Sequence, residues 1–225
     1  MDKHDHAPTD FASPFAALPV SARIKCGAIG MLALALSLGA PLLALAQDPH
    51  HEHHHHAMPS TQDGYVRTQA SYTIPDVGLL DADGIRVSLS NELDGKPVIL
   101  NFIFTSCGAI CPVMSATFSQ VQTALGPERD TVRMVSISID PEQDTPAALK
   151  AYAGKYGAGP QWQMLTGSLD DSIAVQRAFD VYRGDKMNHQ PATFLRAGPG
   201  QPWVRLDGFA RAADILREYR QLHAN

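Results

Sequence analysis

One short stretch of this 225-residue chain constrains its fold more than any other. Residues 98–104 form a nearly continuous apolar run, rich in β-branched and aromatic side chains. Such a run is typical of a strand buried on both faces in the middle of a sheet. Cys107 and Cys111 follow in the cysteine loop (residues 105–111), and Pro112 favours the first turn of a helix. The stretch therefore predicts a central strand that leads through this loop into a helix.

The pattern on either side predicts alternating strands and helices. Turn residues at 81–84 separate two short strands, and Thr145 with Pro146 marks a helix start as N-cap and first helical residue. The expected strands are 72–75, 85–89, 98–104, 131–139, 161–166, 192–196 and 204–206. The expected helices are 112–125, 145–157, 170–179 and 210–222. This order predicts an α/β fold, with a thioredoxin-like mixed sheet flanked by helices.

The N-terminal part of the chain is expected to be a targeting segment rather than part of the folded domain. Residues 1–25 are a polar leader, and residues 26–46 are an apolar segment in which Ser37 is the one polar side chain after Gly27. A membrane-spanning helix needs about 20 apolar residues, so this segment just suffices. Arg23 and Lys25 precede it, which places the N-terminus in the cytoplasm and the following domain outside.

A cleaved signal peptide explains the same segment. Residues 44–46 read Ala-Leu-Ala before Gln47, which is typical of a signal peptidase site. The sequence leaves open whether residues 26–46 anchor the chain in the inner membrane, with the domain in the periplasm, or are removed to release a periplasmic protein. Both alternatives export the domain.

Residues 47–70 are expected to be a flexible linker. Six histidines crowd into residues 50–56, and such a tract cannot form a core, although it can bind metal ions. The folded domain is then residues 71–225. The chain has a net charge of −5 and no basic stripe, so no nucleic-acid partner is expected.

The cysteines are the first candidates for chemistry. The chain has three, and an odd number argues against a disulfide framework. Cys26 borders the apolar segment, whereas Cys107 and Cys111 are four positions apart at the expected start of a helix. Free helix N–H groups favour a thiolate at Cys111, and two thiolates can close on one soft metal ion or on each other. Two inert thiols or a structural disulfide remain alternatives.

His189 is the third candidate. Outside the leader and the linker, the sequence has only His189 and His223, and His223 is expected on the surface. His189 lies just before the strand expected at 192–196, in a loop that faces the cysteine loop in a thioredoxin arrangement. A single histidine is more often structural, but the nearby cysteine pair makes His189 a candidate ligand.

Three motifs in order resemble the Sco/SenC family. They are Cys107-x-x-x-Cys111-Pro112, the segment Ser138 to Pro146 that reads SIDPEQDTP, and His189 before a strand. The resemblance runs through about residues 72–222. It implies a thioredoxin-like domain on a membrane anchor and copper bound by Cys107, Cys111 and His189. It also implies delivery of that copper to cytochrome c oxidase, chiefly to the subunit that carries the CuA centre.

The chain departs from the usual family pattern near the site. Gly108 stands where the family often has Pro, Asn188 stands where it often has Asp, and Pro191 is unusual. These departures leave the three ligands intact and favour an added redox function. Asp140 and Asp144 match the family but are expected to shape the turn and cap the helix, not to bind metal.

Other functions use the same residues. In a thiol–disulfide reductase or redox sensor, Cys107 would attack a partner disulfide and Cys111 would resolve the mixed disulfide. A peroxidatic thiol protein is a third alternative. A structural zinc site would want a fourth ligand.

Overall fold

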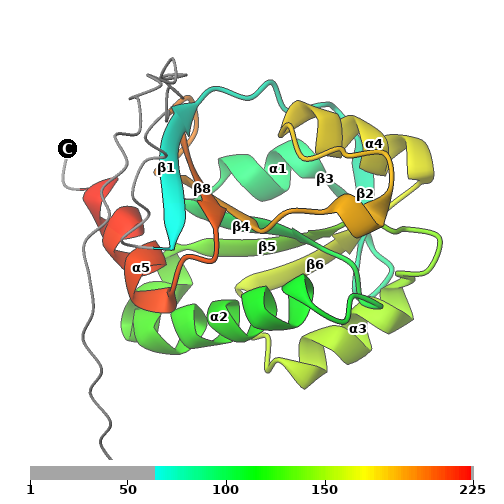
Figure 1. The fold of residues 1–225 in the computed structure, drawn as a ribbon, viewed down its shortest axis with the longest axis horizontal. Helices are drawn as coiled ribbons and strands as arrows, with labels where there is room; N and C mark the ends of the chain where they lie inside the picture. The colour runs from blue at the N-terminus through cyan, green and yellow to red at the C-terminus, as the bar shows by residue number, and fades with distance from the viewer. Residues whose placement is uncertain (1–63, 224–225) are drawn as a thin grey trace, which may run out of the picture. The chain divides into compact units, whose positions relative to one another are not determined.

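The predicted central strand is β4 (Val98–Ile103), and every one of its residues is buried. β5 (Arg133–Ser138) pairs with β4 in parallel, and β6 (Trp162–Thr166) pairs in parallel with β5. β7 (Ala192–Arg196) pairs antiparallel on the other side of β4. This computed structural model describes residues 64–223, and Figure 1 shows how these strands cross the middle of the domain.

The described residues form one eight-stranded mixed sheet of order β1-β8-β7-β4-β5-β6-β2-β3. β8 (Trp203–Gly208) forms a hairpin with β7, and β1 (Tyr65–Ala70) pairs antiparallel with β8. At the other end, β2 (Gly78–Asp81) joins β6 to β3 (Arg86–Ser88). The fold is therefore the predicted mixed α/β arrangement.

Helices cover both faces of the sheet (Figure 1). One face packs against α2 (Ile110–Leu125), α3 (Pro146–Lys155) and α5 (Ala212–Gln221). The other packs against α1 (Leu89–Asp94) and α4 (Leu169–Ala178). Two short 3₁₀ helices, η1 (Gly126–Thr131) and η2 (Lys186–Asn188), lie in connections.

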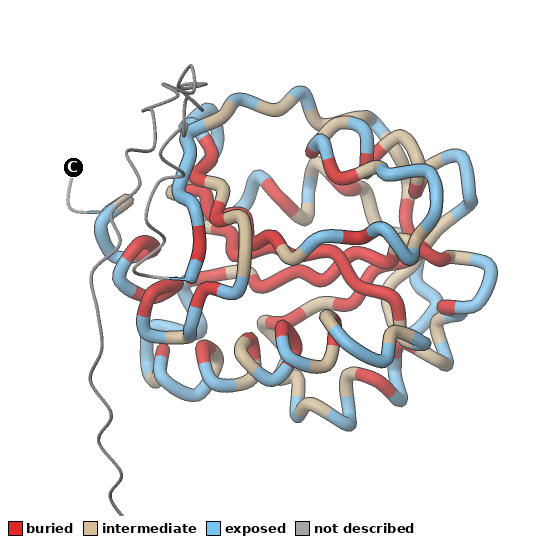
Figure 2. Tube along the Cα trace, in the orientation of Figure 1, coloured by how far each residue is buried: buried red, intermediate tan, exposed pale blue. Residues whose placement is uncertain are grey.

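Alternate residues of the central strands supply the two cores. Ile99 and Ile103 face the α2 side, whereas Val98, Leu100 and Phe102 face the α4 side. Buried positions therefore run continuously along the strands in Figure 2. Burying an aliphatic or aromatic side chain of this size contributes about 1.5–3 kcal/mol, so both cores stabilise the strand that leads to Cys107.

The structure corrects three of the predictions near the start of the domain. Residues 65–70, expected at the end of the linker, form β1, because they extend the sheet along the free edge of β8. The strand expected at 72–75 does not form; Tyr72 instead packs its ring 4.9 Å from that of Phe179. The six-residue helix α1 was not predicted, and it begins at Leu89, where the strand 85–89 was expected to end.

The predictions for the leader, the apolar segment and the histidine tract fall outside residues 64–223. Within that described part, no helix combines the length and hydropathy needed to span a membrane.

Candidate functional site

The cysteine loop connects β4 to α2, and Cys107 caps the helix that follows. The N-cap residue is Ala109, whose side chain makes no capping hydrogen bond. The N–H of Cys111 instead donates to Sγ of Cys107 at 3.4 Å. The N–H of Cys107 itself donates to the carbonyl oxygen of Phe104 at 3.1 Å and closes a turn. Sγ of Cys107 therefore lies at the positive end of the helix.

The pKa of the Cys107 thiol is lowered from the ordinary value. Burial of this half-exposed side chain acts in the opposite direction, since it raises the pKa. Hydrogen bonds from the backbone N–H groups of Cys111, Ala109 and Ile110, together with the Cys111 side chain, lower it by more. Cys107 is thus a partly accessible thiol whose thiolate is stabilised by the helix start.

Cys111 has the opposite environment. Its side chain is fully buried, and Sγ accepts the N–H of Phe104 at 3.5 Å. The pKa of this thiol is raised to about 12, chiefly by burial; the nearby Cys107 and Asp144 also raise it, while the Phe104 N–H lowers it. The expectation that the helix start favours a thiolate at Cys111 is therefore wrong, because the free N–H groups point to Cys107.

Asp144 fixes the other side of the cysteine loop. This buried carboxylate accepts the N–H of Thr105 at 3.0 Å and its hydroxyl at 2.6 Å, and it also accepts the hydroxyl of Ser138 at 2.6 Å. Thr145, as predicted, is the N-cap of α3. Asp144 does not cap that helix; its side chain holds the start of the cysteine loop.

His189 lies at the end of the histidine turn (residues 185–189), which contains η2. Its Nε2 is 3.1 Å from the carbonyl oxygen of Phe102, so Nε2 carries the hydrogen and donates it. This assignment leaves Nδ1 with a lone pair. Nδ1 is buried and has no hydrogen-bond partner among the residues that the structure describes. Burial lowers the pKa of the imidazole, partly opposed by the Phe102 hydrogen bond, and the positive charge of Arg183 lowers it too.

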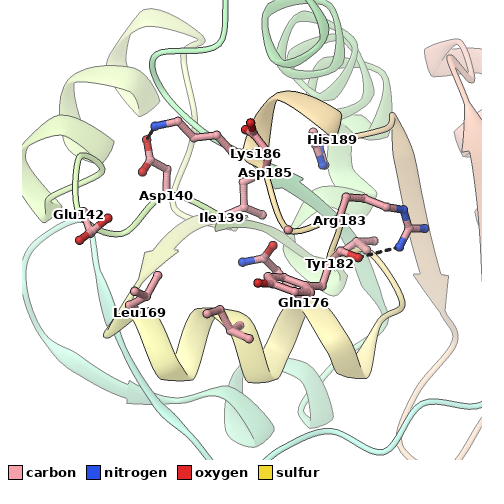
Figure 3. Close-up of a pocket in the computed structure, with 13 residues that line it drawn as sticks. Ile139, Asp140, Glu142, Leu169, Gln176, Tyr182, Arg183, Asp185, Lys186 and His189 are labelled. Carbon is pink, nitrogen blue, oxygen red and sulfur yellow. Dashed lines mark hydrogen bonds and ion pairs between the residues drawn. The ribbon is translucent and has the colours of Figure 1, made fainter.

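A pocket of about 400 Å³ opens beside the histidine turn. It is lined by His189, by the segment that follows β5 and by α4 with the connection after it (Figure 3). Its charged side chains include Asp140 and Lys186, whose Nζ lies 2.5 Å from Oδ2 of Asp140. The imidazole of His189 is thus one wall of a cavity with charges of both signs.

The structure brings two of the three predicted site residues into direct contact. Cys107 and Cys111 are linked by the hydrogen bond at the helix start, whereas His189 is held by Phe102. Cys111 and His189 are nevertheless anchored to backbone groups only two residues apart, at Phe104 and Phe102. Within residues 64–223, no three His, Cys, Asp or Glu side chains are placed so that they could hold a metal ion.

Sequence reasoning missed two contributors to this arrangement. Thr105 was not singled out, although it makes two hydrogen bonds to Asp144. Lys186 was also missed, and nothing in the pattern around it distinguishes it from a solvated surface lysine. For Thr105, the one available signal was its position between the buried strand and Cys107.

A mixed sheet whose central strand leads into a loop with two cysteines, with a histidine before the neighbouring antiparallel strand, defines a thioredoxin-like protein. The particular family is established by comparison. The SCO1/SenC family model matches residues 66–224, and the chain belongs to that family.

The relatives agree with this assignment. The chain is 37% identical over 109 residues to the SCO1 protein homolog of Bacillus subtilis, covering 48% of this chain and 56% of the relative. It spans about half the length of the first relatives that it matches.

Two solved structures of the family share the fold of this domain. BsSco, described as a member of the Sco family of cytochrome c oxidase assembly proteins with a disulfide switch, has 29% identity and a TM-score of 0.59, covering 68% of this chain and 95% of its own. Copper-bound ScoI of Bradyrhizobium japonicum has 29% identity and a TM-score of 0.55, covering 65% and 99%.

Proposed function

We propose that this protein binds copper through Cys107, Cys111 and His189 and passes it to a copper-accepting partner during assembly of cytochrome c oxidase. On the strength of the family resemblance, the proposed acceptor is the subunit that carries the CuA centre. The observation that carries the proposal is the buried Nδ1 of His189, which keeps a free lone pair while Nε2 is held by Phe102, on the strand that leads to Cys107. Family membership and the copper-bound relative support it.

The donor set suits copper. Thiolate sulfur is a soft ligand that favours Cu(I), and a neutral imidazole is a good ligand for Cu(II) as well. The lowered pKa of His189 favours the neutral imidazole near pH 7, and the lowered pKa of Cys107 makes its thiolate easier to form. The thiol of Cys111 would release its proton only when the metal binds, so copper uptake would be coupled to proton release.

Copper binding by all three residues needs a local movement, because they do not converge in the described conformation. Three ligands would leave an open position through which a partner could take the ion by ligand exchange. A disulfide between Cys107 and Cys111 would remove two ligands together, so the redox state would control copper release.

We further propose that the domain works outside the cytoplasm, either held at the inner membrane by residues 26–46 or free in the periplasm after their removal. The charge pattern of residues 23–46 supports export. The histidines at 50–56 are suited to gathering copper ahead of the domain.

Copper binding can be tested on the reduced chain, with the six histidines of residues 50–56 replaced by Gln to remove competing sites. One equivalent of Cu(II) is expected to give a thiolate-to-copper charge-transfer absorption band. The band should be lost in Cys107→Ser, Cys111→Ser and His189→Ala, and retained in His223→Ala. A band of equal strength in all four variants would refute the ligand set.

A second function, thiol–disulfide exchange with a partner, is favoured by the contrast between the two cysteines. The Cys107 thiolate would attack a partner disulfide, forming a mixed disulfide and releasing one partner thiolate. Cys111 would then lose its proton and attack Sγ of Cys107, forming the Cys107–Cys111 disulfide and releasing the second thiolate. Cys111→Ser should therefore trap the mixed disulfide on a non-reducing gel, and Cys107→Ser should not.

A further inference from the structure

Lys186 lies where three connections meet at the end of the sheet. Its Nζ is 2.5 Å from Oδ2 of Asp140, which follows β5. Figure 3 marks this ion pair with a dashed line. The same Nζ is 5.8 Å from the centroid of the Phe104 ring, just before the cysteine loop. Lys186 is itself in the histidine turn, three residues before His189. One side chain therefore links the segments that carry the proposed ligands.

We propose that Lys186 is a positioning residue, whose ion pair with Asp140 latches the histidine turn in the conformation that keeps His189 apart from the two cysteines. The inference rests on the proposed copper site and deepens it, because the latch would set how readily His189 joins the thiols.

Asp140 is a firm anchor for such a latch. Its side chain is only 8% exposed, and its backbone N–H donates to Oγ of Ser138 at 3.0 Å. Ser138 in turn donates to Asp144, which holds Thr105 at the start of the cysteine loop. The lysine is thus tied, through a continuous set of hydrogen bonds, to the segment that positions Cys107.

The histidine turn has few other attachments. Most of its hydrogen bonds stay within the connection between α4 and β7, such as those that Met187 and Asn188 donate to Asp185. Among the described residues, two hydrogen bonds tie the turn to other elements: Lys186 to Asp140, and His189 to the Phe102 carbonyl. Met187 is 72% exposed. If the turn moves so that Nδ1 of His189 reaches a metal ion at the cysteines, these are the two hydrogen bonds that resist the movement, and the one made by Lys186 does not involve a proposed ligand.

Removal of the latch should make copper bind more tightly. A latch that favours the non-binding conformation lowers the apparent affinity in proportion to the share of protein that it holds closed. Removing an ion pair with one buried partner should raise the competent share by about fivefold, the effect of a contact at the upper end of the range for exposed pairs. Copper should therefore bind about fivefold more tightly without the latch.

The test compares Lys186→Met with Asp140→Asn in the full chain, with the histidines at 50–56 replaced by Gln in every sample. Cu(I) affinity of the reduced protein is measured by competition with a chromophoric Cu(I) chelator. Both variants are expected to bind about fivefold more tightly, because both break the same ion pair. Lys186→Arg should retain wild-type affinity, since it keeps the charge.

The two variants change the local charge in opposite directions, which separates a latch from simple electrostatics. Removing a positive charge would tighten copper binding, and removing a negative charge would weaken it. Opposite signs for the two variants would therefore overturn the proposal, as would weaker or unchanged binding in both. Lys150→Met is the matched control, because it breaks a 2.6 Å ion pair to Asp83 between exposed side chains.

A second measurement needs no copper. Amide hydrogen exchange at residues 187–190 of the metal-free protein should be about fivefold faster in Lys186→Met and Asp140→Asn, and unchanged in Lys150→Met. Unchanged exchange in Lys186→Met would overturn the latch even if copper binds. If the wild-type chain binds no copper at the three residues, the proposed function fails, and the exchange rates still decide whether the latch exists.

Discussion

The cysteine loop and the histidine turn reach the same end of the sheet but are held there by different contacts. Thr105 is tied to a fully buried carboxylate, Asp144, and Cys111 is packed into the core. The histidine turn is tied by Lys186, whose side chain is 37% exposed, and by the single hydrogen bond of His189. The cysteine loop is therefore the firm half of the candidate site, held by buried contacts. The histidine turn is the attached half, held by contacts nearer the surface.

The difference indicates which half moves. Buried, charge-assisted hydrogen bonds are costly to break, whereas an ion pair open to solvent on one side is not. Since the three proposed ligands do not converge in the described conformation, we expect the histidine turn to close onto a preformed cysteine loop. Most of the copper-dependent change in structure should then fall in residues 185–189.

The largest effect should come from breaking the firm half. Asp144→Ala would leave the Thr105 N–H, the Thr105 hydroxyl and the Ser138 hydroxyl without their acceptor, at a cost of about 3 kcal/mol in the free energy of unfolding. Asp140→Asn should cost about 1 kcal/mol or less, because Lys186 can be solvated. Urea titrations of both variants measure the contrast.

Asp83→Ala is the control for these titrations. Its carboxylate is exposed and, within residues 64–223, pairs with one exposed lysine, so the change should be within about 0.5 kcal/mol. Equal losses from Asp144→Ala and Asp140→Asn would mean that the two halves of the site are held equally firmly.

The next largest effect is the difference in reactivity between Cys107 and Cys111. Alkylation by iodoacetamide at pH 8 should be about fiftyfold faster at Cys107 than at Cys111, because the thiolate is favoured at one and disfavoured at the other, and because one thiol is accessible. The two rates are measured in Cys111→Ser and Cys107→Ser, both with Cys26→Ser. The rate at Cys107 should rise with pH and level off below the ordinary cysteine pKa. Comparable rates at both thiols would contradict the assignment.

The sequence predicted the firm half of the site better than the attached half. Residues 98–104 indicate a buried strand in the sequence, because both faces of β4 are covered. Thr145 caps α3 through a local hydrogen bond that needs no tertiary context. β1 was missed because only Tyr65 of its six residues is buried, so the apolar signal is absent and pairing with β8 decides the structure.

The chemistry of individual side chains was harder to predict. The spacing of Cys107 and Cys111 identified the pair, but which thiol is ionised depends on how the core closes over Cys111. The contact of Asp144 with Thr105 joins residues 39 positions apart, and the pairing of Lys186 with Asp140 joins residues 46 apart. Such contacts follow from the sheet order, which no local pattern encodes.

The smallest effect tests whether His189 is held neutral. Its pKa in the folded protein is lowered, chiefly by burial, so between that pKa and the unfolded value near 6.5 the unfolded chain binds more protons. Stability from this group is fully present above pH 6.5 and is lost as the pH falls through the folded pKa. Metal-free wild-type protein should therefore lose more stability than His189→Gln between pH 7 and pH 5 in urea titrations.

His223→Gln, which changes an exposed histidine, should follow the wild type. If His189→Gln instead shows the same pH dependence as the wild type, the imidazole takes up a proton as readily in the fold as in the unfolded chain, and the attached half of the site is more open than its hydrogen bond to Phe102 implies.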